Sequence, residues 1–558
     1  MAALTAIPKL APVRRLSLVA AAVLLSVSCR PREASQSAAG APFGTLVVVM
    51  PSDADLLLPP VASTQLASHI TEQIFPRLAD LTMALTTIGD SSFVPVVARR
   101  WDHPDSLTIV FHLDPRARWQ DGTPITADDV VYTYDVYNDT LTRSPFRVNL
   151  ARIASVTKTD SLTVTFRFTR NYPEQMFDAT YQMKLMPKHL LDTIPNERLA
   201  ASSFAHDPAV GAGPFRFAHW EPGAEIAIEA DTTWFLGRPK LARIVWRIMP
   251  DVSASVSALL AGEADAMEVI PQRDEIERVQ RSPDLRLVPY PSPFVAGLVF
   301  NLRRPMFADR ELRRALVRAI NRETITQSVF GPYAEVPGGA LSRISWAAEG
   351  APAQLAWDTA AAARTLDSLG WRRGADGIRR KGSQRLAFTL QVPTTSRSRQ
   401  EAAVLVQDQL KQAGVDVRIE PLEYSVFERR GHSNDFEVTF LSRTLDPSPN
   451  TLSQFWSTSA IARRPGDAGD NQGAYSSPAF DSLFALASAT SDMGQARSRW
   501  HEVLRQINED APAVFLFSLR NNAAIHKRFR DVTIRADSWL GTVATWSVAP
   551  DQRLPRDR

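Results

Sequence analysis

The chain has 558 residues, more than one hydrophobic core usually supports, so its length predicts two or more compact lobes. Its apolar content of 44% and charged content of 22% are ordinary for a globular protein and exclude a wholly disordered chain. The formal net charge is +3, and basic residues near the N-terminus account for this excess, so we expect no nucleic acid partner. The single cysteine excludes an internal disulfide.

The N-terminus, residues 1–28, has the pattern of a signal peptide. A basic segment precedes LSLVAAAVLLSVS, an apolar run shorter than the roughly 20 residues that a membrane span needs. Cys29 follows directly and resembles the lipobox cysteine of bacterial lipoproteins, although Ser26 stands where those proteins usually have Leu. The resemblance implies that Cys29 is lipidated and becomes the new N-terminus. The alternatives are a cleaved signal followed by an incidental cysteine, or cleavage at another position.

Residues 29–43 combine this cysteine with a segment rich in Ser, Ala, Gly and Pro, which predicts a flexible tether. No later stretch contains 18 consecutive apolar residues, so we expect no membrane span after the signal. We therefore expect an exported domain in the periplasm or at the cell surface, anchored to the membrane through Cys29.

Strands and helices then alternate along the chain. Residues 45–50, 107–113 and 162–168 have the composition and alternation of strands. Residues 125–137 predict a helix that Thr126 caps, with Asp129 completing a capping box.

The later part of the chain predicts a βαβ unit. Apolar spacing predicts one helix over 309–325 and another over 400–413, the second ended by Gly414. A strand over 386–392 precedes this second helix and another begins at Val415. The fold class is therefore mixed α/β.

No catalytic or metal motif occurs. The chain lacks the G-x-S-x-G, phosphate-loop and H-E-x-x-H patterns, and its nine histidines are scattered. The sequence GAGPF, 211–215, lacks the third glycine of a dinucleotide fingerprint and predicts a tight turn. We expect no catalytic residue, metal or cofactor.

The stretch PVVARRWDHPDSLTIVFHLDPRARWQDGTPITADDVVYTYD, 95–135, resembles the signature of the family 5 extracellular solute-binding proteins of ABC transporters, which include dipeptide, oligopeptide and nickel binders. Similar segments follow in the family's order and extend the resemblance from about Thr45 to Val548. They are VGAGPFRF (210–217), LLAGEAD (259–265), LVFNLRRPMFADRELRRALVRAINR (298–322), LDSLGW (366–371) and YSSPAFDSL (475–483).

The resemblance implies a two-lobe periplasmic-binding-protein fold of type II with a two-segment hinge. It implies a first lobe over 44–293 with an extra subdomain around 82–205, a second lobe over 294–510, and a return to the first lobe over 511–558. It also implies a monomer that captures a peptide or similar small solute between the lobes and delivers it to the transmembrane subunits of an ABC permease. The alternatives are an exported sensor or chaperone-like binder without transport, or an exported enzyme on the same scaffold.

The resemblance also implies the ligand site. In the peptide-binding relatives, a loop carries Trp, then an Asp that pairs with the peptide's amino group, then Asp-Pro; here Phe440 replaces the Trp and Arg443 replaces that Asp, while Asp446 matches the Asp-Pro. Arginine favours a carboxylate or phosphate, although Asp446 could take over the amino group. The alternative is that Arg443 pairs with a surface carboxylate. The implied site residues are Arg443, Asp446, Phe440, Trp456, Phe294, Asn301, Gly211, Ala212 and Gly213.

Overall fold

The structure of the protein is a computed structural model that describes residues 42–462 and 470–557. The predicted signal peptide, Cys29 and nearly all of the tether lie outside the described residues. Within those ranges, no helix combines the length and the apolar character needed to cross a membrane.

The first lobe is built on a mixed sheet whose central strand, β1 (Thr45–Met50), is buried along its whole length. It pairs in parallel with both of its neighbours, β10 and β11, and β10 pairs antiparallel with β9. Further elements of this lobe are β2 (Ala79–Leu81), β3 (Phe93–Pro95), β8 (Phe215–Glu221), β9 (Glu225–Ala230), β10 (Arg243–Ile248), β11 (Ala266–Met267), β12 (Leu285–Pro291), β22 (Phe529–Arg530), β23 (Ser547–Val548), α1 (Gln65–Ile74), α5 (Val252–Leu260) and α6 (Arg273–Gln280).

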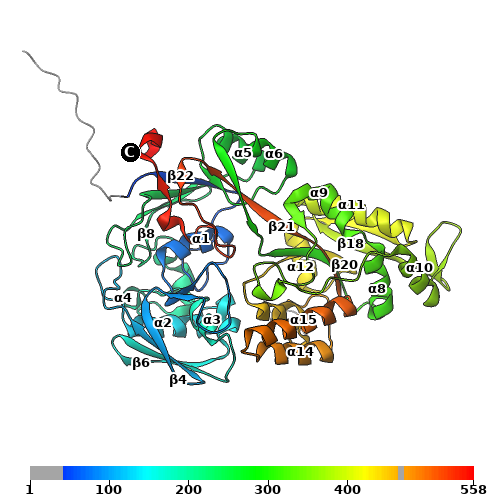
Figure 1. The fold of residues 1–558 in the computed structure, drawn as a ribbon, viewed down its shortest axis with the longest axis horizontal. Coiled ribbons are helices and arrows are strands. Elements are labelled where there is room, and N and C mark those ends of the chain that lie inside the picture. The colour runs from blue at the N-terminus through cyan, green and yellow to red at the C-terminus, as the bar shows by residue number, and fades with distance from the viewer. Residues whose placement is uncertain (1–41, 463–469, 558) are drawn as a thin grey trace, which may run out of the picture. The chain divides into compact units, whose positions relative to one another are not determined.

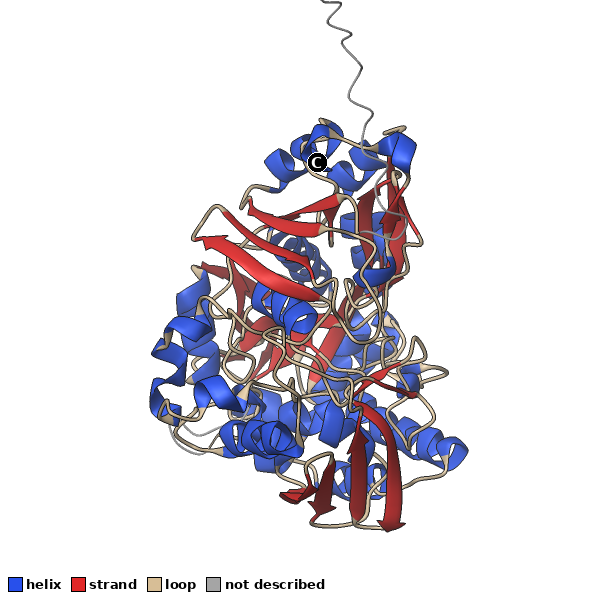
Figure 2. Ribbon diagram, turned by 90° about the vertical axis from the view of Figure 1, so that its left-hand side faces the viewer, coloured by secondary structure: helices blue, strands red, loops and turns tan. Residues whose placement is uncertain are grey.

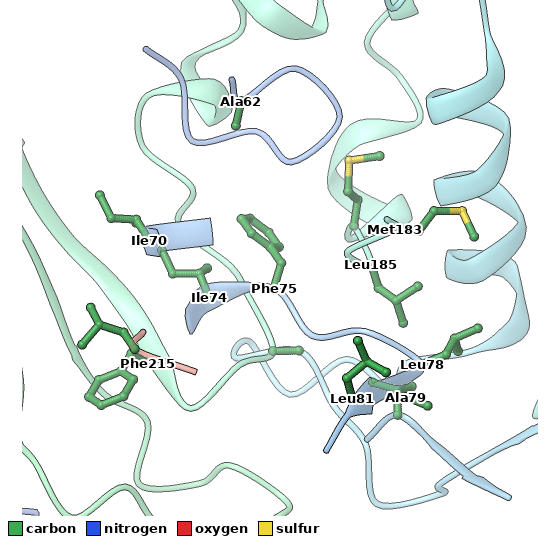
Figure 3. Packing of buried hydrophobic residues seen from close by; sticks show 14 of the residues in the cluster. Ala62, Ile70, Ile74, Phe75, Leu78, Ala79, Leu81, Met183, Leu185 and Phe215 are labelled. Atoms are coloured by element: carbon green, nitrogen blue, oxygen red, sulfur yellow. The ribbon is translucent and has the colours of Figure 1, made fainter. Parts of the chain in front are cut away.

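A four-stranded antiparallel sheet with the order β4-β5-β7-β6 forms a subdomain of this lobe. Buried Phe111 and Phe166 pack edge to face from neighbouring strands, and the same apolar cluster continues into the core around α1. Figure 3 shows Ile74 and Phe75 at the end of α1 within this cluster. The subdomain contains β4 (Ala98–Asp105), β5 (Thr108–Leu113), β6 (Ile153–Asp160), β7 (Thr163–Phe168), α2 (Ala127–Asn138), α3 (Gln175–Thr180) and α4 (Lys188–Leu191).

The second lobe contains the predicted βαβ unit. Strands β18 and β19 pair in parallel and α11 connects them, which confirms the prediction. The lobe contains β13 (Phe294–Phe300), β14 (Ala334–Glu335), β15 (Arg372–Arg373), β16 (Arg379–Lys381), β17 (Gln384–Arg385), β18 (Ala387–Pro393), β19 (Asp416–Leu422), β20 (Val438–Thr444), α7 (Pro305–Ala308), α8 (Arg310–Ala319), α9 (Arg322–Phe330), α10 (Thr359–Ser368), α11 (Arg397–Gln412), α12 (Tyr424–His432), α13 (Leu452–Trp456), α14 (Pro478–Ser488) and α15 (Met493–Asp510).

Short 3₁₀ turns complete the two lobes, and Figure 2 shows how loops join the strands and helices. These turns are η1 (Pro145–Leu150), η2 (Asn196–Ala201), η3 (Ser203–Ala205), η4 (Gly331–Tyr333), η5 (Trp346–Ala348), η6 (Pro449–Thr451), η7 (Thr458–Ala460), η8 (Val543–Thr545), η9 (Pro550–Gln552) and η10 (Pro555–Asp557).

One long strand, β21 (Ala513–His526), belongs to both lobes (Figure 1). Its first half pairs with β13 of the second lobe, and its second half pairs with β11 and β12 of the first. The chain also crosses between the lobes where β12 runs into β13. Two backbone segments therefore connect the lobes, and residues after β21 pack in the first-lobe core.

Two helix predictions had different outcomes. Helix α2 begins with the predicted capping box, in which the backbone N–H of Thr126 donates to Asp129 at 2.8 Å. The single helix predicted over 309–325 is wrong. The chain leaves the helical conformation at Ile320, and the side chain of Asn321 accepts a hydrogen bond from the Thr324 N–H, starting α9 as a separate helix.

A buried ion network ties the C-terminus to the first-lobe sheet. Arg528, which is 2% exposed, donates to Asp265 at 2.9 Å and to Asp557 at 2.6 Å. The same two carboxylates accept from backbone N–H groups of β1, Asp265 from Val47 and Asp557 from Thr45. One guanidinium thus joins the first strand to the last turn of the chain.

We predict that Arg528→Met destabilises the protein by about 3–5 kcal/mol, because it removes the guanidinium that pairs with buried Asp557 and leaves buried Asp265 with Arg556 alone. Urea unfolding measures the free energy. The matched control is Arg530→Met, two residues away on an exposed side chain, with an expected change within about 0.5 kcal/mol. Equal stability of the two variants would contradict the role given to Arg528.

Candidate ligand-binding cleft

Two adjoining cavities lie between the lobes. The first, which we call the hinge cavity, has a volume of about 450 Å³ and extends from α1 to Phe294 and Thr444 of the second lobe. The second, the rim cavity, has a volume of about 500 Å³ and lies between η1 and α3 on one side and residues 446–454 on the other. Gln182 lines both cavities, so together they form one interlobe cleft.

The hinge cavity combines aromatic walls with ionisable groups from the first lobe. Glu72 lies 3.1 Å from Arg77; burial opposes its ionisation, but Arg77, Lys184 and Arg535 outweigh this effect and lower the pKa of Glu72 to about 2. Burial together with nearby Arg77 lowers the pKa of Lys184 to about 7. The aromatic side chains are those of Tyr137, Phe146, Tyr181, Phe294 and Trp539.

Glu268 is a buried acid in the same cavity without a charged partner of its own. Burial raises its pKa to about 8, and burial lowers the pKa of its neighbour His69 to about 4. Both groups are therefore uncharged near neutral pH. The side chain of Gln65 donates to Glu268 at 2.8 Å, so the acid is held in place at the cavity wall.

The rim cavity carries more carboxylates than cations. Asp178 and Asp446 line it from opposite lobes, with Arg152 at 3.6 Å from Asp178. Burial raises the pKa of Asp178 to about 7. Burial and the nearby Glu174 raise the pKa of Asp446 to about 8. The three carboxylates share one guanidinium, so this end of the cleft favours a cationic group.

Glu174 joins the two lobes directly, through Ser448 and Asn450, which line the rim cavity. Its carboxylate is 2% exposed and accepts from the hydroxyl of Thr87 in its own lobe. From the second lobe, it accepts from the Ser448 hydroxyl at 2.5 Å and from the side-chain amide of Asn450. Thr87 in turn accepts from the indole of Trp346 in the second lobe at 2.9 Å. We call this set of contacts the Glu174 bridge.

Comparison with known proteins identifies the family. The family described as "Bacterial extracellular solute-binding proteins, family 5 Middle" matches residues 92–463, about two thirds of the chain. The chain belongs to this family.

Relatives and solved structures agree with this assignment. The oligopeptide-binding protein AppA of Bacillus subtilis is 28% identical over 440 residues, which cover 77% of this chain and 79% of AppA. The structure of that AppA with a nonapeptide superposes with a TM-score of 0.77 at 24% identity, covering 91% of this chain and 99% of the other. NikZ of Campylobacter jejuni with Ni(L-His) gives a TM-score of 0.78 at 22% identity, covering 91% and 100%. The two-lobe type II fold is thereby confirmed.

Four of the nine site residues expected in this family 5 protein line a cavity. Phe294 lines the hinge cavity and Asp446 the rim cavity. Arg443 and Trp456 line neither of these two cavities. They lie instead in a small separate chamber inside the second lobe.

The opposite faces of β20 explain where Arg443 lies. Leu441, Arg443 and Leu445 point to one face and line the chamber, whereas Thr444 lines the hinge cavity from the other. The guanidinium of Arg443 stacks 5.0 Å from the ring centre of Phe455 and donates to the carbonyl of Asp470 at 3.2 Å.

Phe440 and Asn301 have structural roles in this fold. Phe440 has no exposed surface and packs edge to face on Phe517 in the second-lobe core. Asn301 is 1% exposed, and its amide donates to the carbonyls of Asn434 and Phe436. Because neither side chain lines a cavity of the cleft, we do not keep them in the proposed site.

The GAGPF segment brings the first-lobe backbone close to the end of α1. The N–H groups of Ala212 and Gly213 both donate to the carbonyl of Ile74, at 2.9 and 2.7 Å. A Cβ at Gly211 would lie 2.4 Å from that carbonyl, and one at Gly213 would lie 2.2 Å from the Gln73 carbonyl. The segment requires glycine because two backbones pack together, and its side chains do not reach the cleft.

Sequence reasoning missed Glu174, Asp178, Glu268 and Lys184. The first two lie in a segment, NYPEQMFDAT, that resembles no motif, and the other two are single charged residues between apolar ones. Each is a charged residue that tertiary structure buries, and the sequence carries no signal of that burial.

We predict that Asp446 and Asp178 each make the protein less stable as the pH rises from about 4 to 8. Asp446 and Asp178 have raised pKa values, so the folded state holds protons that the unfolded chain releases near pH 4, and this stabilisation is fully present only below that pH. Each group contributes at most about 1.4 kcal/mol per pH unit to the fall.

Melting temperatures of wild type and Asp446→Asn, measured from pH 5 to 9, test this prediction. The variant is expected to have a shallower fall than wild type, whereas Asp408→Asn on the exposed side of α11 keeps the wild-type slope. If the melting temperature of Asp446→Asn falls with pH as steeply as that of wild type, the carboxyl of Asp446 is already ionised in the folded wild-type protein.

Proposed function

We propose that this family 5 protein captures a peptide or a similarly sized organic solute between its lobes and delivers it to the permease of an ABC importer. The observation that carries the proposal is the cleft itself, whose two adjoining cavities each fall in the size range of small-molecule sites and have walls from both lobes. The name of the relative AppA of Bacillus subtilis, an oligopeptide-binding protein, supports peptide capture.

The cleft fits a binder better than an enzyme. Its ionisable groups are engaged with one another or held by hydrogen bonds, as Glu72 is by Arg77 and Asp178 by the hydroxyl of Tyr172 at 2.7 Å. Within the described residues, no group of three or more His, Cys, Asp or Glu side chains is arranged to hold a metal ion. We therefore propose capture and release of an unchanged solute.

The charges of the cleft support a ligand with an ammonium group. The rim cavity offers Asp178 and Asp446, which a bound cation would ionise, because an opposite charge nearby favours the carboxylate form. Asp446 thus takes the role that the family's amino-binding Asp has in peptide-binding relatives. The aromatic side chains of the hinge cavity then pack on the remainder of the solute.

The Glu174 bridge supports a closed state held by interlobe hydrogen bonds. Because two backbone segments connect the lobes, the lobes can rotate about them, and the bridge forms only when residues 448–450 reach the subdomain. We propose that ligand binding favours this closed form, which the permease recognises. We further propose a monomer anchored outside the cytoplasm through lipidated Cys29.

The proposal is tested by native mass spectrometry of the purified protein, followed by denaturation and identification of what is released. We expect one peptide or amino compound per chain, or, if the protein is empty, thermal stabilisation by a peptide mixture. Ligand at about 100 times its dissociation constant adds roughly 2.7 kcal/mol of stability. If no ligand is released and no peptide mixture stabilises the protein, capture of a peptide or amino solute is contradicted.

We predict that Glu174→Ala raises the dissociation constant of such a peptide by about tenfold to hundredfold, because the closed form loses hydrogen bonds to a charged group. The increase is expected in the dissociation rate, which stopped-flow fluorescence measures, more than in the association rate. Glu197→Ala, on an exposed turn of the same lobe, is the control and leaves both rates unchanged. An unchanged dissociation rate in Glu174→Ala would exclude the bridge from closure.

A further inference from the structure

The chamber inside the second lobe has its own chemistry, apart from the interlobe cleft. Its walls are mostly apolar, and three of the groups that line it, Arg443, Asp470 and Gln472, are polar. The apolar walls are made by Val295, Gly297, Val299, Ala340, Leu441, Leu445, Phe455, Trp456, Ala513 and Phe515.

Gln472 is the first unexplained group in this chamber. Its side chain is 4% exposed, and neither its amide oxygen nor its amide nitrogen has a hydrogen-bond partner among the described residues. Buried amides are normally paired, because leaving a donor or acceptor unpaired costs about 1–3 kcal/mol. The amide therefore has a free donor at the chamber wall.

Arg443 is the second unexplained group. Burial lowers the pKa of its guanidinium. No carboxylate lies within salt-bridge distance of it in the parts of the chain that the structure describes, and its one hydrogen bond goes to the Asp470 carbonyl. The carboxylate of Asp470 is directed elsewhere, accepting from the Gln454 amide at 2.9 Å. The carboxylates of Asp470 and Glu428 favour the charged form of Arg443 without contacting it, so this buried guanidinium gains from an anion at contact distance.

The free space has room for the two oxygens of a carboxylate. Its volume of about 30 Å³ has room for roughly two water-sized atoms, on the scale at which one water needs 10–15 Å³. Asp470 lines both the chamber and the rim cavity, so the two spaces adjoin at this residue. Arginine and a primary amide together offer several N–H donors to two oxygens.

We propose that this chamber is a subsite for a carboxylate carried by the ligand, held by Arg443 and Gln472, with the apolar walls packing on the carbon stem. The inference rests on the proposed capture of a solute in the adjoining cleft and names one of its chemical groups. The sequence predicts that Arg443 binds an anionic group, and this proposal keeps that prediction. It places the anion in the chamber of the second lobe and not in the interlobe cleft.

Two probes separate this inference from the proposed function. The first is propionate, compared with propionamide at constant ionic strength, because its carboxylate can occupy the chamber without the contacts that a peptide makes in the cleft. We expect propionate to raise the melting temperature of the purified wild-type protein, and propionamide to have a much smaller effect. The second is a tetrapeptide that contains Glu, compared with the same peptide containing Gln, with affinities measured by calorimetry.

The variants are Arg443→Gln and Gln472→Leu, with Arg418→Gln on the exposed face of β19 as the matched control. In Arg443→Gln, we expect the propionate shift to disappear and the preference for the Glu peptide, about tenfold to hundredfold in wild type, to fall to near unity. The Gln peptide is expected to bind Arg443→Gln and wild type equally. Gln472→Leu is expected to reduce the preference by a smaller factor, and Arg418→Gln to leave it unchanged.

The outcomes are distinct. A propionate shift that depends on Arg443, without binding of either peptide, supports the carboxylate subsite and contradicts peptide capture. Equal binding of the Glu and Gln peptides by wild type, without a propionate shift, overturns the subsite and leaves peptide capture standing. An equal loss of affinity for both peptides in Arg443→Gln also overturns it, because that pattern indicates a structural role for the guanidinium.

Discussion

The contact on which the cleft depends is the buried carboxylate of Glu174. It belongs to the first-lobe subdomain and accepts hydrogen bonds from Ser448 and Asn450 of the second lobe, so it exists in this form only while the lobes are together. Without it, the rim cavity would have only one wall, and Asp178 and Asp446 would face water on opposite lobes. Enclosure of the cleft, burial of its acids and their shifted pKa values therefore follow from the same interlobe contact.

The backbone allows this contact to form and break. The lobes are connected where β12 enters β13 and in the middle of β21. Each crossing lies within or beside a paired strand, so hydrogen bonds hold the chain on both sides of it. The far side of the first lobe is fixed by the Arg528 network, which joins β1, β11 and the end of the chain. With the first lobe joined by this network and two strand crossings between the lobes, we expect the lobes to rotate about the crossings as units, which suits capture and release of a solute.

Local features of the fold were predictable because their causes are local. The capping box of Thr126 and Asp129, and the β18–α11–β19 unit, depend on neighbouring residues and on helix and strand periodicity. The break at Ile320 was missed because apolar spacing continues across it, while the cap of Asn321 competes with helix continuation. The resemblance located residues 440–456, but the face of β20 on which Arg443 lies depends on strand register. Glu174 and Glu268 acquire their roles only through tertiary burial, which no spacing in the sequence records.

The central claim is that the Glu174 bridge holds a closed, ligand-bound form. Spin labels at Leu141→Cys of the first lobe and Ala479→Cys of the second, both exposed, would report the interlobe distance in a Cys29→Ser background, which removes the only native cysteine. Pulsed electron resonance is expected to show a single short distance with bound peptide, and a longer, broader distribution without it or in Glu174→Ala. The same distance in all three samples would contradict the account.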